Sequence, residues 1–207
     1  MPALIGHAVF GRKLIDKYFQ GIDEARFYVG TTFPDIRNLG VIPRDQTHTT
    51  GIKLVSLQVC ENAFDLGFKA HSLVDETHFR FMQQNGIYNF GSELRFAIQA
   101  LKVYEDRLLY QKLNNWIQIA EYFTEIFDEE KVFQIDLYDI RRWHNYIKRY
   151  FFEGPSDNTA RNFNAETGFP SSRAEELLKT LEILKSDKKY EDTIFKFYDR
   201  FDELVLG

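Results

Sequence analysis

Residues 62–82 read Asn-Ala-Phe-Asp-Leu-Gly-Phe-Lys-Ala-His-Ser-Leu-Val-Asp-Glu-Thr-His-Phe-Arg-Phe-Met. Apolar residues recur along this stretch at helical spacing, so we predict a helix over 62–82. His71, Asp75 and His78 then lie at positions i, i+4 and i+7 and point from one face of that helix. The helix also carries four large apolar side chains, at Phe64, Phe68, Leu73 and Phe81. The polar groups are therefore expected in or beside the core.

Two imidazoles and a carboxylate in a place of low dielectric are costly to bury unless a cation binds them. Four of the five histidines also lie within the first 80 residues, namely His7, His48, His71 and His78. This clustering favours a divalent transition metal site. The alternative is a set of core histidines that are hydrogen-bonded to carbonyl groups or to a carboxylate one turn away.

The composition is that of one globular domain, with 207 residues, 44% hydrophobic and 28% charged. The net charge of −5 and the absence of a basic block argue against general nucleic-acid binding. The lone Cys60 excludes an internal disulfide, which fits a reducing cytoplasm. We expect neither a secretory signal at the N-terminus nor a transmembrane segment. The protein is predicted to be cytoplasmic.

Further ligand candidates flank the central helix. His7 lies on the apolar stripe of a first helix predicted over 3–19. Asp35 follows Pro34, which moves the carboxylate onto a turn or a helix start. Asp45 and His48 are three residues apart on a loop that precedes a helix predicted through residues 52–59, and a loop histidine is easily aimed into a cleft.

Glu105 lies on the apolar stripe of the next predicted helix, for which Ser92 is the expected N-cap. A carboxylate on such a stripe needs a partner. That partner is a metal, or Lys102 or Arg107 if Glu105 reaches the surface. Its neighbour Asp106 is the weaker ligand candidate.

We predict an all-α, single-domain, multi-helix bundle over residues 1–207, with a metal site in a cleft between the N-terminal helices. Residues 1–110 are expected to supply the metal site and 111–207 the supporting helices. The predicted helices outside 62–82 and the Glu105 helix are 3–19, 23–29 (ending at Gly30), 52–59, 114–127, 137–152, 171–184 and 190–204. Residues 153–170 are rich in Gly, Pro, Asn, Asp and Ser and are predicted to be a mobile loop. Basic residues at 141–149 indicate either a phosphate-binding patch or a solvated helix face.

The order of these groups resembles a known family. His7, Phe33-Pro34-Asp35-Ile36, Asp45-x-x-His48 and Gly67-x-x-x-His71-x-x-x-Asp75-x-x-His78 resemble the zinc-dependent phospholipase C family and the helical zinc-dependent nucleases related to it. The resemblance covers about the first 110 residues, and the His-x-x-x-Asp-x-x-His segment is its specific part. It implies an all-α fold and a zinc cluster that hydrolyses phosphate esters.

The resemblance also implies roles for individual residues. It makes Asp35, His48, His71 and Asp75 the ligands of a first zinc ion. It makes His78 and Glu105 ligands of a second and His7 a ligand of a third. This chain departs from the family pattern in two places: no tryptophan stands at the N-terminus, and Leu101 occupies the position of a ligand histidine one turn before Glu105. One or two zinc ions, or other divalent transition metals, are therefore expected.

The function expected from these residues is hydrolysis of a small-molecule or lipid phosphate ester by metal-activated water. Asp35 or Asp45 is the candidate general base, and Arg37 or Arg44 the candidate phosphate ligand. The alternative is a non-catalytic helical protein in which a structural metal or a hydrogen-bond network holds the N-terminal helices together. The sequence leaves open the substrate, the metal and the oligomeric state.

Overall fold

The computed structural model describes residues 3–91 and 94–206, which form helices and loops without a β-strand. The prediction of an all-α fold is confirmed. The α-helices are α1 (Leu4–Tyr18), α2 (Glu24–Thr32), α3 (Leu54–Leu57), α4 (Ala63–Gln84), α5 (Ala97–Leu109), α6 (Trp116–Glu121), α7 (Asp128–Lys131), α8 (Leu137–Glu153), α9 (Asp157–Glu166), α10 (Ser171–Ser186) and α11 (Lys188–Leu204). The 3-10 helices are η1 (Phe33–Leu39), η2 (Arg44–Gln46) and η3 (Tyr110–Lys112).

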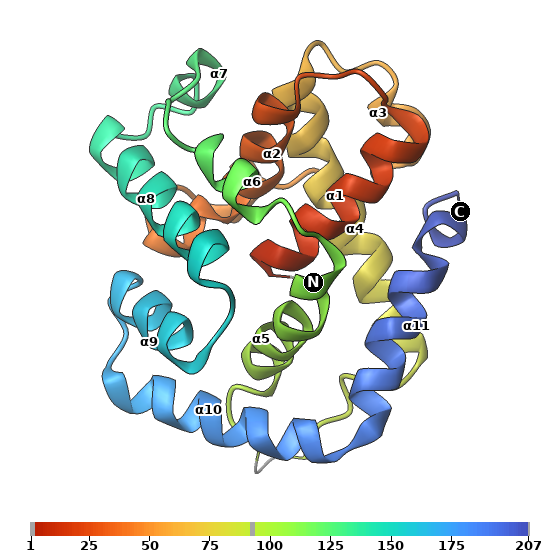
Figure 1. The fold of residues 1–207 in the computed structure, drawn as a ribbon, viewed down its shortest axis with the longest axis vertical. Coiled ribbons are helices and arrows are strands. Elements are labelled where there is room, and N and C mark those ends of the chain that lie inside the picture. The colour runs from red at the N-terminus through yellow and green to blue at the C-terminus, as the bar shows by residue number, and fades with distance from the viewer. Residues whose placement is uncertain (1–2, 92–93, 207) are drawn as a thin grey trace.

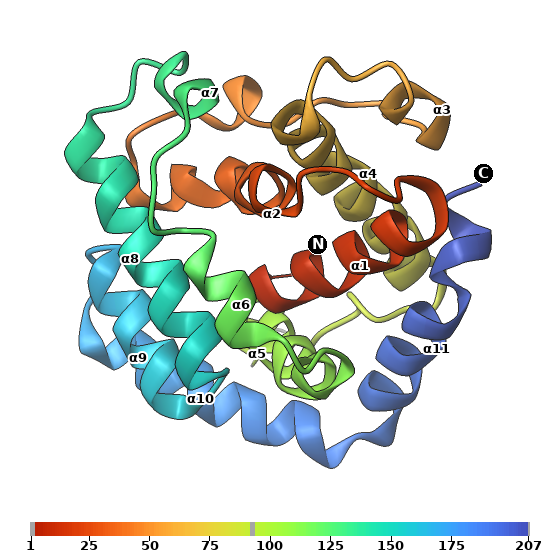
Figure 2. The same cartoon turned by 45° about the horizontal axis from the view of Figure 1, so that its top comes forward.

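The helices α1, α2, α4 and α5 form the centre of the bundle, and the later helices enclose it (Figure 1). The helix α10 runs along the lower edge and connects α9 on the left to α11 on the right, in both Figure 1 and Figure 2. The buried apolar side chains form one continuous cluster that extends from Leu4 to Val205. Both halves of the chain therefore contribute to the same core.

In the first half of the chain, α1 and α4 confirm the helices predicted over 3–19 and 62–82. Two other expectations are wrong. The predicted helix over 52–59 is reduced to α3, four residues long. The helix α2 does not stop at Gly30 but continues to Thr32. The proposed N-cap Ser92 lies outside the described residues.

The second half differs from prediction mainly around residues 153–170. The predicted mobile loop is wrong, because most of the segment forms the helix α9. Ser156 caps this helix, because its hydroxyl accepts a hydrogen bond from the backbone N–H of Thr159. The Thr159 hydroxyl in turn accepts one from the backbone N–H of Ser156. This reciprocal cap starts a helix in a composition that otherwise favours turns. The predicted helix over 114–127 is broken into α6 and a following loop.

Two glycines explain how α2 and α4 pack so closely. A Cβ atom at Gly30 would overlap the carbonyl group of Phe64, and one at Gly67 would overlap the carbonyl oxygen of Phe27. Each glycine therefore allows the backbone of one helix to lie directly against the other. Gly30 therefore lies within α2 and serves helix packing.

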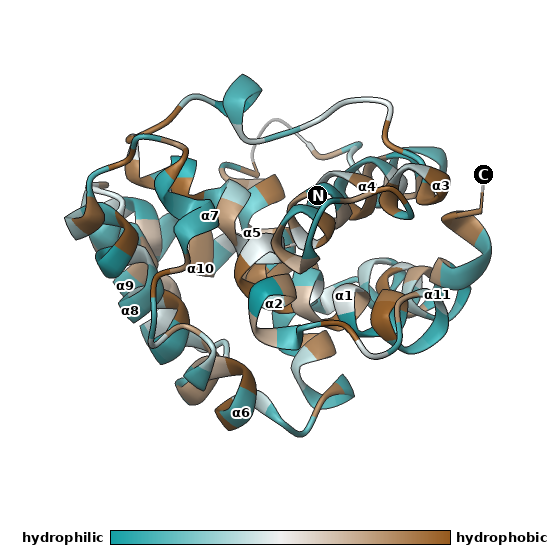
Figure 3. Ribbon diagram, turned by 90° about the horizontal axis from the view of Figure 1, so that it is seen from above, coloured by the Kyte–Doolittle hydropathy of each residue, from teal (hydrophilic) through white to brown (hydrophobic). Residues whose placement is uncertain are grey.

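Polar and apolar residues alternate along the helices in Figure 3, as expected for helices with one face on the core. Cys60 is half-buried against this core, and burial raises the pKa of its thiol to about 11. Among the described residues, no helix combines the length and the apolar character that crossing a bilayer requires.

Candidate metal centre

The imidazole of His71 is oriented by the neighbouring helix. Its Nδ1 atom lies 2.9 Å from the carbonyl oxygen of Thr31, near the end of α2. Because a carbonyl oxygen only accepts, Nδ1 carries the proton and Nε2 keeps a lone pair directed into the bundle. Metal-binding histidines are commonly oriented in this way by a backbone carbonyl group.

His48 presents a second nitrogen to the same point from the loop after η2. Its Nδ1 lies 2.9 Å from the hydroxyl of Thr47, which itself donates to the carbonyl oxygen of Arg44 at 3.2 Å. When the hydroxyl hydrogen is donated to Arg44, Nδ1 of His48 is the donor and its Nε2 is unprotonated; in the other tautomer, Nε2 of His48 donates to Nε2 of His71. The Nε2 atoms of His48 and His71 lie 3.2 Å apart. Two lone pairs that face each other at this distance are stabilised by a cation between or beside them.

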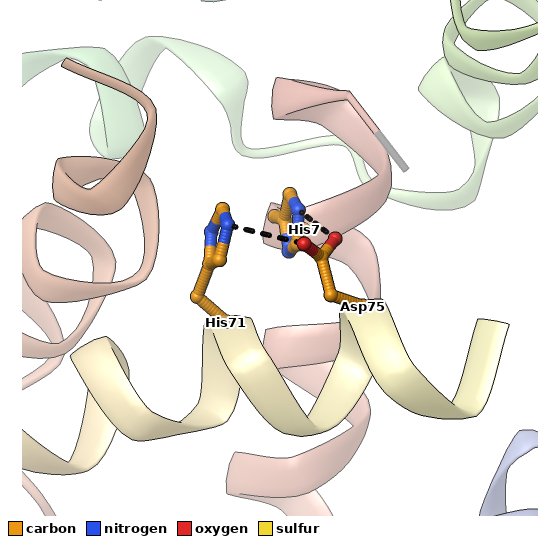
Figure 4. Close-up of side chains that lie close together, drawn as sticks. All are labelled: His7, His71 and Asp75. Atoms are coloured by element: carbon orange, nitrogen blue, oxygen red, sulfur yellow. Dashed lines mark ion pairs between the residues drawn. The ribbon is translucent and has the colours of Figure 1, made fainter. Parts of the chain in front are cut away.

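His7 and Asp75 complete one group of donors with His71 (Figure 4). The rings of His7 and His71 are stacked, with centroids 3.8 Å apart and planes 12° from parallel. The Nε2 atom of His7 lies 3.3 Å from Oδ1 of Asp75. The other carboxylate oxygen, Oδ2, lies 3.6 Å from Nε2 of His48 and 3.8 Å from Nε2 of His71.

Asp35 forms a second group of donors with His48 and His71. In each group, the candidate ligand atoms lie within 4.8 Å of one another. The Asp35 carboxylate accepts a hydrogen bond from the Asn38 amide at 3.4 Å and lies 3.6 Å from the Arg37 guanidinium. The two groups share His71, so donors from α1, η1, α4 and the loop after η2 converge on one region. We call these five residues the donor cluster: His7, Asp35, His48, His71 and Asp75.

Four members of the donor cluster are buried, His48 is partly exposed, and the cluster is incompletely hydrogen-bonded. His7 and His71 are 1% exposed, and Asp75 is 4% exposed. Within residues 3–91 and 94–206, neither ring nitrogen of His7 and neither carboxylate oxygen of Asp75 has a partner with hydrogen-bond geometry. A buried polar group without a partner costs about 1–3 kcal/mol, so a bound cation would relieve several such costs together.

The protonation states suit a metal. Burial lowers the pKa of His71 to about 3, assisted by the nearby His7. Burial and the charge of Arg44 lower the pKa of His48 to about 4. For Asp35 and Asp75, burial opposes ionisation, but the neighbouring imidazoles outweigh it and hold both pKa values below the usual range. Neutral imidazoles beside ionised carboxylates are the ligand forms that transition metals bind.

The remaining two predicted ligands form a separate pair. The Nε2 atom of His78 lies 3.0 Å from Oε2 of Glu105, and both residues are 1% exposed. The hydroxyl of Tyr88 lies 3.5 Å from Nδ1 of His78. Among the described residues, neither His78 nor Glu105 belongs to a group of three candidate ligands. Five of the seven predicted ligands therefore converge, and the other two contact each other.

A pocket of about 320 Å³ reaches the donor cluster from the surface. It is lined by Arg44, Asp45, His48, Thr49, Thr50, Ser72, Asp75 and Glu76. Asp45 is exposed at this pocket, and the Arg44 guanidinium lies 3.6 Å from the Asp75 carboxylate. The pocket therefore connects His48 and Asp75 to the surface.

Ser72 and Glu76 were not identified from the sequence as parts of the site. The Ser72 hydroxyl accepts a hydrogen bond from the backbone N–H of Thr49 at 3.0 Å, and Glu76 accepts one from Gly51 at 2.7 Å. They therefore attach the loop that carries His48 to α4. Ser72 directly follows His71 and Glu76 directly follows Asp75 on α4. This proximity to ligand candidates is the only feature of the sequence that could have indicated their role.

Asp106 holds the start of α1, which has no side-chain cap from Ala3. Its carboxyl group accepts a hydrogen bond from the backbone N–H of Gly6 at 3.0 Å and another from the Tyr150 hydroxyl at 2.8 Å. Gly6 directly precedes His7. Asp106 therefore positions a member of the donor cluster, while the adjacent Glu105 contacts His78.

No family model, curated protein or solved structure matches this chain.

Proposed function

We propose that this protein is a zinc-dependent hydrolase of phosphate esters, acting on a small-molecule or lipid phosphodiester or phosphomonoester. The observation that carries the proposal is the donor cluster at the inner end of a pocket. Three imidazoles and two carboxylates are a suitable ligand set for zinc. The residue order also resembles that of the zinc-dependent phospholipase C family, and we propose the same reaction class.

Zinc bound to the donor cluster would supply Lewis acidity, lowering the pKa of water and polarising a phosphoryl oxygen. Asp45 is the better candidate for the general base, because it lines the pocket and stands outside both donor groups. Asp35 belongs to one of those groups, so we assign it as a ligand. Arg44 lines the pocket beside Asp75 and would orient the phosphate.

The competing proposal is a structural site, in which a metal or a hydrogen-bond network only holds the helices together. The burial of the donors favours it, since structural zinc sites are closed. The buried atoms of His7 and Asp75 that lack hydrogen-bond partners argue for a bound cation rather than a satisfied network. The pocket that reaches His48 and Asp75 favours catalysis over a closed structural site. The single cysteine supports a cytoplasmic location.

Turnover by the zinc-loaded wild type separates the two proposals, and the Asp45→Asn variant tests the assignment of the general base. If Asp45 is the base, kcat for a generic chromogenic phosphodiester or phosphomonoester falls by about 100-fold or more, while zinc content and melting temperature stay unchanged. The matched control is Glu125→Gln, which removes another exposed carboxylate and should leave kcat unaltered.

A zinc-loaded wild-type protein without chelator-sensitive turnover on either substrate would contradict the hydrolase proposal. Retained turnover in Asp45→Asn would instead contradict only the assignment of the base. A large drop in melting temperature on zinc removal, with no turnover in either state, would support the structural site.

A further inference from the structure

A second hollow, of about 310 Å³, lies along α8 and the end of α9. It is lined by Tyr138, Arg141, Arg142, Asn145, Tyr146, Arg149 and Glu166. We call it the arginine hollow. We infer that the arginine hollow binds a phosphate group, carried either by a small soluble molecule or by a lipid headgroup.

The lining of the arginine hollow follows from the helical repeat of α8. Relative to Tyr138, its other lining residues on α8 lie at positions +3, +4, +7, +8 and +11. This spacing is that of one continuous face of a helix. The opposite face of α8 carries Ile140, Trp143, Ile147 and Phe151 into the core. The arginines are therefore held on a rigid element rather than on a loop.

The arginine hollow carries an excess of positive charge. Three guanidinium groups line it, and Glu166 is its one lining carboxylate. Glu166 is shared, since its carboxylate lies 3.2 Å from Arg142 and 3.3 Å from Arg149. Arg142 also donates to the backbone carbonyl of Glu166 and lies 4.0 Å from Asp139. These contacts fix Arg142 and the end of α9.

Arg141 differs from the other two arginines. Its guanidinium donates to the carbonyl oxygen of Thr124 at 3.3 Å. Among residues 3–91 and 94–206, no carboxylate lies within ion-pair distance of it. In a protein of net charge −5, a local cluster of guanidiniums with one shared carboxylate attracts an anion.

The donors favour a phosphate over a simple halide or carboxylate. Guanidinium groups bind phosphate oxygens in paired hydrogen bonds, and several arginines together suit a tetrahedral oxyanion. Asn145 offers an amide, and Tyr146, which is 5% exposed, has a phenol that burial holds neutral by raising its pKa well above the usual value. The volume is at the lower end of the range for small-molecule sites.

The structure also decides which basic residues of 141–149 take part. His144 turns into the core, 1% exposed, with Nε2 2.6 Å from the Glu130 carboxylate. Lys148 donates to the Thr124 hydroxyl at 2.9 Å and lies 3.7 Å from Glu121. The arginine hollow shares no lining residue with the donor cluster, so the inference does not depend on the proposed hydrolase activity.

The test is calorimetric titration of inorganic phosphate into the full-length, zinc-loaded protein and into the variant Arg141→Gln/Arg149→Gln. We expect the variant to lose one phosphate site, or to bind phosphate about tenfold more weakly, because two charge-assisted donors are removed. The charge-matched control is Arg95→Gln/Arg200→Gln, which removes two exposed arginines elsewhere and should bind as the wild type does.

A second arm measures co-sedimentation with vesicles of phosphatidylcholine, with and without phosphatidic acid. Binding that requires phosphatidic acid and Arg141 identifies a headgroup, and binding of free phosphate alone identifies a soluble ligand. Arg141→Gln by itself removes one exposed hydrogen bond, to the Thr124 carbonyl oxygen, and no ion pair among the described residues, so it controls for misfolding of the double variant. The inference would be overturned if Arg141→Gln and Arg141→Gln/Arg149→Gln both bound phosphate and vesicles as the wild type does. It would also be overturned if the wild type bound neither phosphate nor vesicles. Hydrolysis of a generic phosphate ester should be unaffected by Arg141→Gln/Arg149→Gln, so the two proposals fail separately.

Discussion

The imidazole rings of His7 and His71 stack face to face, 3.8 Å between centroids, although 64 residues separate them in the chain. His71 is held by the Thr31 carbonyl group, whereas His7 has no hydrogen-bond partner among the described residues. The stack brings the first helix and the fourth to one point beside Asp75. A metal at that point would join α1 to α4, and four predictions follow from the way this region is built.

Replacing His71 with Ala should abolish tight zinc binding. His71 is the one residue common to both donor groups, so its loss should lower zinc affinity by about 100-fold or more. Isothermal titration or metal analysis after dialysis measures the change. The control is His144→Ala, which removes a buried histidine outside the donor cluster and should lower stability without changing zinc stoichiometry. Equal zinc affinity in His71→Ala and wild type would contradict the proposal that His71 is a zinc ligand.

Zinc affinity should depend weakly on pH in the acidic range. Ligand histidines must be deprotonated, and the pKa values of His48 and His71, lowered to about 4 and about 3, keep these two rings neutral at pH 6. Two histidines of ordinary pKa would together cost roughly tenfold in affinity between about pH 7.5 and pH 6. We expect a smaller loss, measured by competition with a chromogenic chelator at each pH. A loss of tenfold or more would show that these imidazoles are not desolvated as the structure has them.

Asp106→Asn should change how stability depends on pH. Burial raises the pKa of Asp106 from 3.8 to about 7, so the folded protein binds a proton here that the unfolded chain releases. This group therefore lowers stability as pH rises between about 4 and 7, by on the order of 3 kcal/mol in total. Carboxyls with lowered pKa, such as Asp75, act in the opposite direction, losing stability as pH falls.

The difference in unfolding free energy between Asp106→Asn and wild type isolates the contribution of Asp106. Denaturant titrations at several pH values measure this difference. Between about pH 4 and pH 7, the unfolding free energy of the variant should rise relative to that of the wild type. The reason is that Asn retains an acceptor for the Gly6 N–H without a charge. A pH-independent difference between the two proteins would contradict the raised pKa.

Gly67→Ala should destabilise the fold and weaken zinc binding at the proposed metal centre. The added Cβ would overlap the Phe27 carbonyl oxygen, and neither backbone can yield without separating α2 from α4. Overpacking of this kind costs about 1–3 kcal/mol, and the movement would also shift Thr31 away from His71. Chemical denaturation and zinc titration measure the two effects.

The control for Gly67→Ala is Lys69→Ala on the same helix, which removes only a partly exposed ion pair with Asp65 and should cost about 0.5 kcal/mol or less. If Gly67→Ala were as stable as Lys69→Ala, the close approach of α2 and α4 would not be required for folding.

The sequence by itself determined the long amphipathic helices and the common face of His71 and Asp75. Both depend on the 3.6-residue period, which acts between near neighbours in the chain. It also identified His7, Asp35 and His48 as candidate ligands, because buried imidazoles and carboxylates need a partner. It misjudged residues 153–170, where composition indicated a loop but the Ser156 cap and packing against α10 produce α9.

Only the tertiary structure decided which candidates meet. The approach of α2 to α4 through Gly30 and Gly67 places the Thr31 carbonyl group against His71, and the Asp106 cap sets His7 above it. The same packing pairs His78 with Glu105 and separates both from the two donor groups. The physical reason is that distances between helices depend on how side chains and backbones pack across the whole core, and no local repeat in the chain encodes them.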